Sequence, residues 1–448
     1  MMSRNKVIEQ LGKGELFVTE LETPLREDTT ELHTFPLYRR YGEEQIAVHI
    51  VGHMTNGNLD GGYGIEKAYD SFLKEHTATA KITYYLDALG RSIQGKPPTV
   101  QLDQRSNGGV VLTIDSEIQR IAEEVGEKYL SKGAVVVMTP DGKIRASASF
   151  PSFDPNHLEK SLTDEENKPM FNRAFASYNV GSTFKIVTAA AALESGIAPS
   201  RSYFCRGQID VSGQIIKCHN HYGHGLLKME QAMAESCNPY YISLGLLLNP
   251  AALLQMARDM SFSKAGILAS GFASQGGYLP TLSELNSPAA IANLSFGQGS
   301  LSATPIQISL MTCCIVNQGK TPFAKLVEGL SEDGKVLSEK TEDAAPIHAI
   351  RKQTADTVKR FLITGVMERE NQQAKPTKTT AGGKTATAQT GRFRDGEEIC
   401  QGWFTGFFPA EEPQYIVTVL CEDAESGNLS AGPVFREIAD RVTEQMEE

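Results

Sequence analysis

Ser182 and Lys185, three residues apart at the start of an alanine-rich segment, form a potential nucleophile with its own base. Residues at this spacing lie one turn apart on the same face of a helix, so the amine can reach the hydroxyl and accept its proton. Gly181 allows a tight turn into the helix, and the positive end of the helix dipole favours the alkoxide that forms on Ser182. This arrangement predicts acyl transfer through a covalent serine ester.

A lone Ser-x-x-Lys motif occurs often by chance, so its meaning depends on companion motifs. Ser236-Cys237-Asn238 and then Lys384-Thr385-Ala386-Thr387 follow it along the chain. Taken separately, Ser236 and Asn238 would be interpreted as a helix cap, and Lys384 as part of a solvated strand end. The three motifs in this order are instead the set shared by serine β-lactamases and penicillin-binding proteins.

Over most of its length the sequence resembles the class B high-molecular-weight penicillin-binding proteins, which are peptidoglycan D,D-transpeptidases. The resemblance implies an α+β fold, an antiparallel sheet flanked by helices, with a smaller N-terminal pedestal domain and no cofactor. Segments beyond the three motifs that look like family landmarks are Leu112-Thr113-Ile114-Asp115, Asn172-Arg173-Ala174, Phe296-Gly297-Gln298-Gly299 and Thr304-Pro305-Ile306-Gln307.

The resemblance gives the residues of the first two motifs catalytic roles. Ser182 Oγ attacks the carbonyl between the two terminal D-alanines of a stem peptide, and neutral Lys185 accepts its proton. Lys185 is neutral only if burial or a nearby positive charge lowers its pKa, and Lys384 is the obvious neighbour. Ser236 is expected to bridge the two lysines and pass the proton to the departing amine, while Asn238 orients Lys185.

The third motif is expected to bind the substrate. Lys384 and Thr385 would hold the carboxylate of the terminal D-alanine, or of a β-lactam. The backbone N–H groups of Ser182 and Thr387 would form the oxyanion hole, because fixed donors best meet a developing charge. Residues 387–390 can then pair with the extended substrate backbone by β-strand addition.

Two positions depart from the family pattern. Ala386 stands where the family has glycine, and a methyl group that crowds the substrate or tilts the strand would reduce activity or drug affinity. If the methyl group crowds the strand edge, restoring glycine should speed acylation. Val180 stands where proline is common, and this change only loosens the pre-set turn.

Length and composition indicate an ordinary globular protein with at least two domains. The chain has 448 residues, of which 40% are hydrophobic and 22% charged, and exceeds what one hydrophobic core usually supports. A formal net charge of −11 argues against a nucleic-acid surface, which needs a basic patch. We place a truncated, non-catalytic pedestal at residues 1–105 and the transpeptidase domain at residues 106–448, with a linker zone at Gly95-Lys96-Pro97-Pro98.

Periodicity and turn residues predict the main elements of the second domain. A helix is expected over residues 114–130, followed by two strands around Val135 and Ala146 joined at Pro140-Asp141-Gly142. Strands are expected over residues 382–389, 402–408 and 415–421, and a closing helix over residues 434–446. Helices around an antiparallel sheet make an α+β arrangement.

No stretch of 18 or more apolar residues occurs in the sequence. The family normally carries an N-terminal membrane anchor, so we expect a soluble form from which the anchor was removed. The full-length protein would act at the extracytoplasmic face of the bacterial cell membrane. The partners implied by the resemblance are peptidoglycan stem peptides, β-lactam antibiotics, a SEDS-type glycan polymerase and other cell-wall machinery.

Seven cysteines leave at least one thiol unpaired. A hairpin turn centred between Val211 and Ser212 would place Cys205 opposite Cys218, which makes an extracytoplasmic disulfide geometrically possible. The segment Cys218-His219-Asn220-His221-Tyr222-Gly223-His224 suggests zinc with Cys205 as a further ligand. Its spacing fits no standard finger pattern and the catalysis needs no metal, so we expect polar loop histidines and no metal site.

Three rival functions share these motifs. A β-lactamase must hydrolyse its acyl-enzyme quickly and is usually a shorter single domain. A β-lactam sensor is normally attached to a membrane signalling module. The third is a cell-wall scaffold that keeps the fold without activity, an alternative that Ala386 keeps open.

Overall fold

The structure is a computed structural model that describes residues 8–9, 12, 40–42, 44–55, 60–77, 79–89, 93, 95–103, 107–394 and 396–447. Contacts divide the chain into two compact units. The smaller comprises residues 1–43, 71–109 and 330–338, and the larger comprises residues 44–70, 110–329 and 339–448. The predicted pedestal at residues 1–105 stays a prediction.

The smaller unit contains an antiparallel pair of strands, β3 (Thr79–Thr83) and β4 (Thr99–Asp103), in register from Thr79 opposite Asp103 to Thr83 opposite Thr99. Most of helix α4 (Asp70–His76) also belongs to this unit. The chemistry-bearing motifs all lie in the larger unit.

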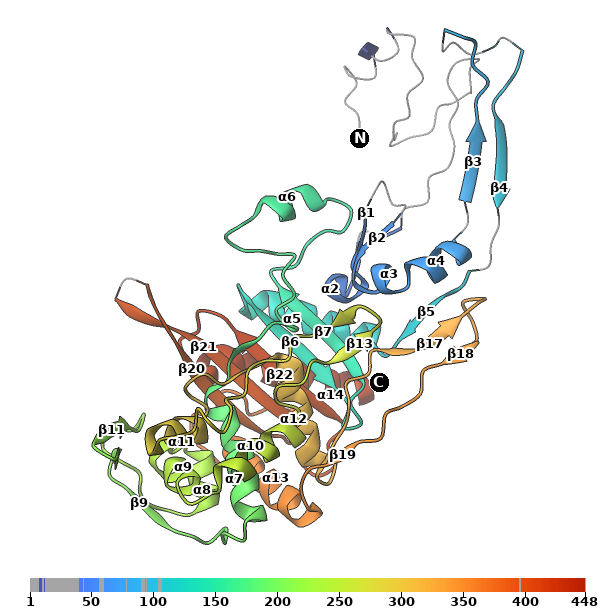
Figure 1. Cartoon of the computed structure of the whole chain (residues 1–448). Helices are drawn as coiled ribbons and strands as arrows, with labels where there is room; N and C mark the ends of the chain where they lie inside the picture. Colours follow the sequence, from blue (N-terminus) through green and yellow to red (C-terminus); the bar gives the residue numbers. More distant parts are fainter. Residues whose placement is uncertain are drawn as a thin grey trace. The chain divides into compact units, whose positions relative to one another are not determined.

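A five-stranded antiparallel sheet forms the centre of the larger unit (Figure 1). Its order is β20 (Gly382–Arg394), β21 (Glu397–Phe408), β22 (Tyr415–Cys421), β6 (Gly133–Met138) and β7 (Ile144–Phe150). The predicted hairpin around Pro140-Asp141-Gly142 and the three predicted C-terminal strands are therefore confirmed. Because β20 lies at one end of this order, one of its edges pairs with no strand of the sheet.

Successive residues of each strand point to opposite faces of the sheet, so the sheet separates two hydrophobic cores. Val135 and Val137 enter the core beneath helices α5 (Ser116–Tyr129) and α14 (Gly432–Glu447). Val136, between them, enters the core on the other face, where α12 (Pro305–Val316) packs. The two long helices predicted from periodicity are confirmed within two residues at every end.

Further helices lie in the same larger unit. They are α7 (Lys185–Glu194), α8 (Met229–Ala234), α9 (Asn238–Gly245), α10 (Pro250–Asp259), α11 (Pro288–Ser295) and α13 (Lys352–Met367). The first two motifs lie at or next to the starts of α7 and α9. Helix α12 starts with a capping box, in which Thr304 Oγ1 accepts from Gln307 N (3.2 Å) and Gln307 Oε1 accepts from Thr304 N (2.9 Å). The landmark segment around Thr304 is thus a helix start that fixes α12 against the sheet.

Shorter elements complete the described chain. They are α2 (Val48–Val51), β1 (His53–Thr55), β2 (Asp60–Tyr63), α3 (Gly64–Ala68), β5 (Gly109–Leu112), α6 (Leu158–Thr163), β8 (Tyr178–Asn179), the 3-10 turn η1 (Gly181–Phe184), β9 (Tyr203–Cys205), β10 (Gln208–Val211), β11 (Gln214–Lys217), β12 (Gly225–Leu227), β13 (Ile267–Ala269), β14 (Phe272–Ala273), β15 (Ser302–Ala303), β16 (Lys320–Thr321), β17 (Val327–Ser331), β18 (Glu339–Lys340), β19 (Ile347–His348) and the π-helical turn η2 (Gly427–Ala431).

The hairpin β10–β11 has a different register from the one that would oppose Cys205 and Cys218. Val211 pairs with Gln214, so the turn is Ser212-Gly213, and both turn residues have positive φ (53° and 89°). A two-residue turn with two positive φ values matches the twist of a hairpin, and this fixes the register. Cys205 pairs instead with Gly225 of β12, and the cysteines are free thiols.

Within the described residues, no single helix has the length and apolar composition to cross a membrane. The pair α9 and α10 meets the length and composition criteria only jointly, and it is bent by 111°.

Candidate active site

The nucleophile candidate Ser182 lies on the 3-10 turn η1, directly before α7. Gly181 has φ +61°, and its N–H donates to Gly297 O at 2.9 Å. Gly297 also has positive φ, and a Cβ there would lie 1.8 Å from Gly181 O. Only glycine therefore fits at 297, which explains how the Phe296-Gly297-Gln298-Gly299 landmark supports the turn that presents Ser182.

Lys185 is the first residue of α7 and is fully buried. Its Nζ donates to Asn238 Oδ1 (2.6 Å), to Ser236 O (2.6 Å) and to Ser236 Oγ (3.1 Å). The ring of Tyr241 lies 5.8 Å from the same amine. The first two motifs are therefore brought together, and Asn238 accepts a hydrogen bond from Lys185.

Ser236 Oγ lies between two lysine amines, because Lys384 Nζ donates to it at 3.0 Å. The backbone of Ser236 has φ +52°, which costs energy for a residue other than glycine. The interpretation of Ser236 as a helix cap is wrong, because Cys237 is the N-cap residue of α9. Ser236 is instead held in a strained conformation that aims its hydroxyl at Lys185 and Lys384.

Burial lowers the pKa of both amines. The pKa of Lys185 falls to about 7 because desolvation penalises its charged form. The pKa of Lys384 falls well below its usual value, first through burial and then through the charges of Lys185 and Arg369. The sequence prediction of a depressed Lys185 pKa is consistent with this burial.

Ser182 and Lys185 are neighbours along one helix start, but among the described residues no hydrogen bond joins Ser182 Oγ to Lys185 Nζ. Catalytic hydrogen bonds often tighten only when substrate binds. Ser182 is half-buried, so its hydroxyl is accessible to a ligand.

Strand β20 carries the third motif at the edge of the sheet. Thr387 is exposed, and its Oγ1 accepts a hydrogen bond from Gly427 N (3.1 Å). Two residues further on, Gln389 O accepts from Asn179 Nδ2 (2.6 Å). The segment 387–390 thus lies on an edge strand with Thr387 and Gln389 exposed, and the Gln389 carbonyl is bonded to Asn179 in this structure.

The methyl group of Ala386 is buried, with 3% of the residue exposed. Ala386 and Ala388 both face Gly181, where an added Cβ would lie 3.3 Å and 3.1 Å from their methyl groups. The Ala386 side chain therefore packs beneath the turn that carries Ser182. The buried position of the Ala386 methyl group therefore does not support the expectation that it crowds the substrate.

Two groups of residues escaped the sequence analysis. Arg173, in a landmark segment, pairs with Glu422 at 3.1 Å, and Tyr178 donates to the same carboxylate at 2.7 Å. This buried network fixes the chain just before η1. The second group is a cluster of Cys205, Cys218, His224 and Cys237, of which the sequence analysis grouped the first three and missed Cys237.

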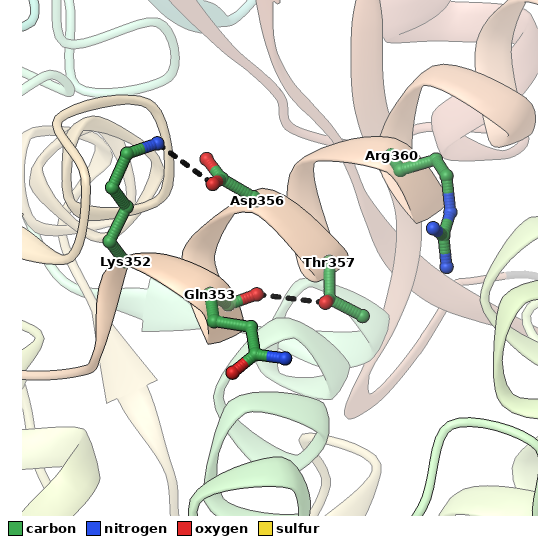
Figure 2. Close-up of a pocket in the computed structure, with 5 residues that line it drawn as sticks. All are labelled: Lys352, Gln353, Asp356, Thr357 and Arg360. Carbon is green, nitrogen blue, oxygen red and sulfur yellow. Dashed lines mark hydrogen bonds and ion pairs between the residues drawn. The ribbon is translucent and has the colours of Figure 1, made fainter.

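A hollow of about 470 Å³ on α13 lies apart from these motifs (Figure 2). Its lining residues are Lys352, Gln353, Asp356, Thr357 and Arg360. Lys352 pairs with Asp356 (2.8 Å), and Thr357 Oγ1 donates to Gln353 O (2.8 Å). Exposed helical pairs of this kind stabilise the helix itself, so we assign this hollow no chemical role.

Together, the fold and site define a serine acyl-transfer protein in which two buried lysines share a serine hydroxyl. Residues 133–440 match the family described as penicillin binding protein transpeptidase domain. The chain belongs to the family of penicillin-binding transpeptidases, as the motifs predicted.

Among its relatives is the stage V sporulation protein D of Bacillus subtilis, 30% identical over 423 residues. The match covers 89% of this chain and 63% of that relative, so this chain spans less than two thirds of the relative's length. The peptidoglycan D,D-transpeptidase PbpA of Mycolicibacterium smegmatis is 27% identical, with 73% and 71% covered.

Solved structures share the fold. Penicillin-binding protein A of M. tuberculosis, as a ceftriaxone acyl-enzyme, has a TM-score of 0.75 at 24% identity, covering 89% of this chain and 91% of that one. The D,D-transpeptidase domain of a peptidoglycan glycosyltransferase from Eggerthella lenta has a TM-score of 0.74 at 25% identity, covering 92% and 93%. The predicted α+β transpeptidase fold is confirmed.

Proposed function

We propose that this chain is a serine D,D-transpeptidase that cross-links peptidoglycan stem peptides through an acyl-enzyme on Ser182, and that β-lactams acylate the same serine. The observation that carries the proposal is Ser236 Oγ, 3.1 Å from Lys185 Nζ and 3.0 Å from Lys384 Nζ. A hydroxyl between two amines of lowered pKa can relay a proton in either direction. The relatives named D,D-transpeptidases support the same reaction.

Acylation starts when Ser182 Oγ attacks the carbonyl between the two terminal D-alanines. Neutral Lys185 takes the hydroxyl proton, directly or through Ser236 Oγ. When the C–N bond breaks, Ser236 returns that proton to the departing D-alanine amine. The amine of a second stem peptide then attacks the ester, forms the cross-link and gives its proton back to Ser182.

Substrate binding is the role of the third motif. Lys384 and Thr385 hold the terminal carboxylate, whose negative charge favours the charged form of Lys384. The backbone N–H groups of Ser182 and Thr387 stabilise the oxyanion. The substrate backbone pairs with residues 387–390 along the edge of β20 that carries no further strand of the sheet, where it would compete with Asn179 Nδ2 for Gln389 O.

The cellular setting follows the family. The chain acts at the extracytoplasmic face of the cell membrane, where its substrate lies, with residues 1–105 as a non-catalytic pedestal. A structural neighbour, the penicillin-binding protein PBP2 of Helicobacter pylori, was solved as a complex with MreC. We propose that this chain also works with cell-wall assembly proteins, including a SEDS-type glycan polymerase. Depletion of this protein, followed by observation of the stage at which the cells arrest, would show which cell-wall process it serves.

A fluorescent penicillin tests the proposed function against its rivals. A stable covalent label on Ser182, together with cross-linked product from stem peptides, supports a transpeptidase. Rapid loss of the label with penicillin turnover would mean a β-lactamase. A stable label without cross-linking would mean a sensor, and no label would mean a scaffold.

The acylation rate should rise with pH and level off above about pH 7. The neutral Lys185 amine is the active base, so protonation below its pKa of about 7 removes it. We expect about a tenfold fall in the second-order acylation rate for each pH unit below 6. The measurement uses one penicillin between pH 5 and 9. A rate that rises only near pH 10 would place the Lys185 pKa at its ordinary value and contradict a neutral base.

Ala386→Gly should leave the acylation rate within about threefold of the parent. The buried methyl group lies beneath Gly181 and away from the substrate edge, so its loss affects mainly stability, by about 0.5 to 1 kcal/mol. The measurements are the acylation rate with one penicillin and thermal unfolding. A tenfold faster Ala386→Gly would show instead that the methyl group obstructs the substrate.

A further inference from the structure

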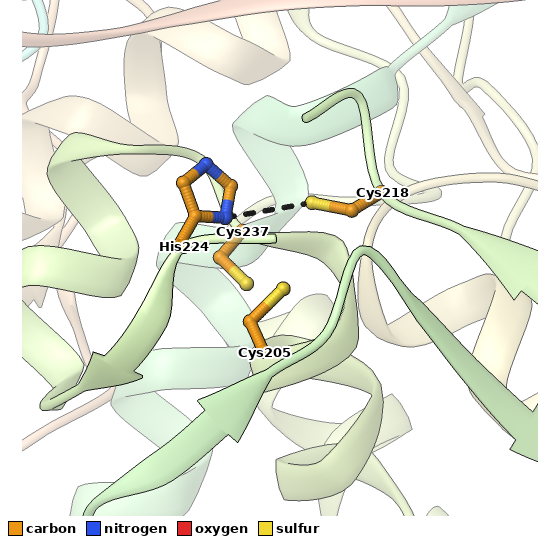
Figure 3. A group of neighbouring side chains, drawn as sticks. All are labelled: Cys205, Cys218, His224 and Cys237. Atoms are coloured by element: carbon orange, nitrogen blue, oxygen red, sulfur yellow. Dashed lines mark hydrogen bonds between the residues drawn. The ribbon is translucent and has the colours of Figure 1, made fainter. Parts of the chain in front are cut away.

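Four metal-binding side chains converge beneath the second motif (Figure 3). One ligand atom from each of Cys205, Cys218, His224 and Cys237 lies within 4.8 Å of every other. The three cysteines are buried, with at most 1% of each exposed, and His224 is half-buried. The catalytic steps proposed above use none of these four side chains.

The four residues come from four separate places in the larger unit. Cys205 ends β9, Cys218 follows β11, His224 precedes β12, and Cys237 is the N-cap residue of α9. Three of the ligands lie within residues 205–224, and Cys237 adds the fourth from the start of α9. The spacing fits no finger pattern because the fourth ligand belongs to another element.

Two glycines make this convergence possible. A Cβ at Gly207 would lie 2.2 Å from His221 O, and a Cβ at Gly223 would lie 2.3 Å from Cys205 O. Both glycines have positive φ (85° and 83°). In addition, Cys218 N donates to Gly207 O at 2.8 Å. Only glycine fits at these two positions, and the close backbone contacts there bring Cys205, Cys218 and His224 together.

The spacing of the ligand atoms suits a tetrahedral ion. With Zn–S distances of about 2.3 Å and Zn–N distances of about 2.0 Å, tetrahedral geometry requires ligand atoms roughly 3.5 to 3.8 Å apart. Cys218 Sγ lies 3.6 Å from His224 Nδ1. The widest separation, 4.8 Å, closes to this range with side-chain shifts of about 1 Å.

We propose that Cys205, Cys218, Cys237 and His224 bind one structural zinc ion. Three thiolates with one imidazole are a standard closed site for zinc, and sulfur ligands disfavour magnesium and calcium. Binding releases three thiol protons, and the two positive charges of zinc against three thiolates leave one negative charge. The sequence expectation of no metal rested on linear spacing, which does not include Cys237, and on a catalytic reaction that needs no metal.

The alternatives leave part of the cluster unexplained. Buried thiols that only fill space do not require an imidazole nitrogen facing them. A disulfide would use two of the three thiols and leave the third and His224 without a role. A zinc ion uses all four ligands, and it protects the thiols from oxidation outside the cell, where free thiols tend to pair.

The zinc site also has a position that bears on catalysis. Cys237 lies between Ser236 and Asn238, the two residues that bind the Lys185 amine. Ser236 has a positive φ and therefore needs support from its surroundings. A zinc bond to Cys237 would hold the strained motif from beneath, so that Cys237 acts as a positioning residue.

Zinc content of the purified protein is the direct test, and it does not depend on the proposed function. The full chain, purified without metal-binding tags and under mild reduction, should contain about one zinc ion per chain by elemental analysis and native mass spectrometry. Replacement with Co²⁺ should give the visible absorption bands of a tetrahedral thiolate site. This measurement needs no variant, so a variant that fails to fold leaves the proposal testable.

Matched variants locate the site. Cys205→Ser and His224→Ala should each lose most of the bound zinc, whereas Cys400→Ser and His221→Ala should keep it. Cys400 lies in β21, and His221 is an exposed neighbour of His224. Wild-type protein without stoichiometric zinc, or with a disulfide between any two of the three cysteines, would overturn the proposal. Zinc that remains in Cys205→Ser and His224→Ala would overturn it equally.

Chelation tests the positioning role, which rests on the proposed function. Removal of zinc should slow acylation of Ser182 by roughly tenfold and lower the thermal unfolding temperature, and added zinc should restore both. Unchanged acylation in zinc-free protein would overturn the positioning role while the zinc site stands. No acylation of the zinc-loaded protein would overturn the proposed function instead.

Discussion

Ser182→Ala should abolish covalent labelling by penicillin while leaving the fold intact. The hydroxyl is the atom that becomes the ester, and no other group of the site can replace it. Ser182 is half-buried on a turn held by the backbone of Gly297, so loss of one oxygen removes little packing. The measurement is gel fluorescence after labelling, with thermal unfolding to establish that the variant is folded.

Ser195→Ala is the matched control for this result. Ser195 is the exposed C-cap residue of the same helix α7, so it shares the element without sharing the site. It should label like the parent. A label that persists in Ser182→Ala and maps to a different serine would contradict the assignment of the nucleophile.

Lys185→Ala should be nearly as damaging, with a fall in the acylation rate of roughly 10³-fold or more. Nucleophile and base act as one unit, so the loss of either removes most of the rate enhancement. The change also leaves Asn238 Oδ1 without its amine donor and Ser236 Oγ with Lys384 Nζ as its remaining lysine donor. The measurement is the second-order acylation rate with one penicillin, at a pH above 7 where the parent base is neutral.

Lys352→Ala, at the exposed start of α13, is the control for loss of a lysine without loss of the base. It should acylate at the parent rate. Because Lys185 is fully buried, circular dichroism and thermal unfolding must show that Lys185→Ala is folded before its rate is interpreted. A folded Lys185→Ala that acylates within tenfold of the parent would contradict the proposed base.

Local sequence determined much of this molecule. Ser182 and Lys185 are three residues apart, and this spacing by itself predicts that they lie one turn apart on the same face at the start of a helix. The strands and long helices were predictable because the spacing of hydrophobic residues reflects which side of each element is buried. In β6, for example, Val135 and Val137 enter one core and Val136 enters the other. The three motifs in order identified the family, and its model and fold matches confirm that identification.

The register of the β10–β11 hairpin was beyond local pattern. The alternating segment is compatible with a turn at Val211-Ser212 or at Ser212-Gly213, and only the second gives two positive φ values. The choice moves Cys205 out of that hairpin and into pairing with Gly225. Cys205 therefore comes within 4.8 Å of Cys218 through tertiary packing and not through cross-strand pairing.

The sequence by itself determined the chemical identity of the site: two serines, two lysines and an amide in motifs whose order is diagnostic. Only the tertiary structure decided their environment, because burial and long-range packing have no signature in linear spacing. Burial lowers the pKa of Lys185 and Lys384, and the folded chain places Ser236 Oγ within hydrogen-bond distance of both amines. The same long-range packing brings Cys237 to Cys205, Cys218 and His224, since contacts between distant segments depend on the folded backbone.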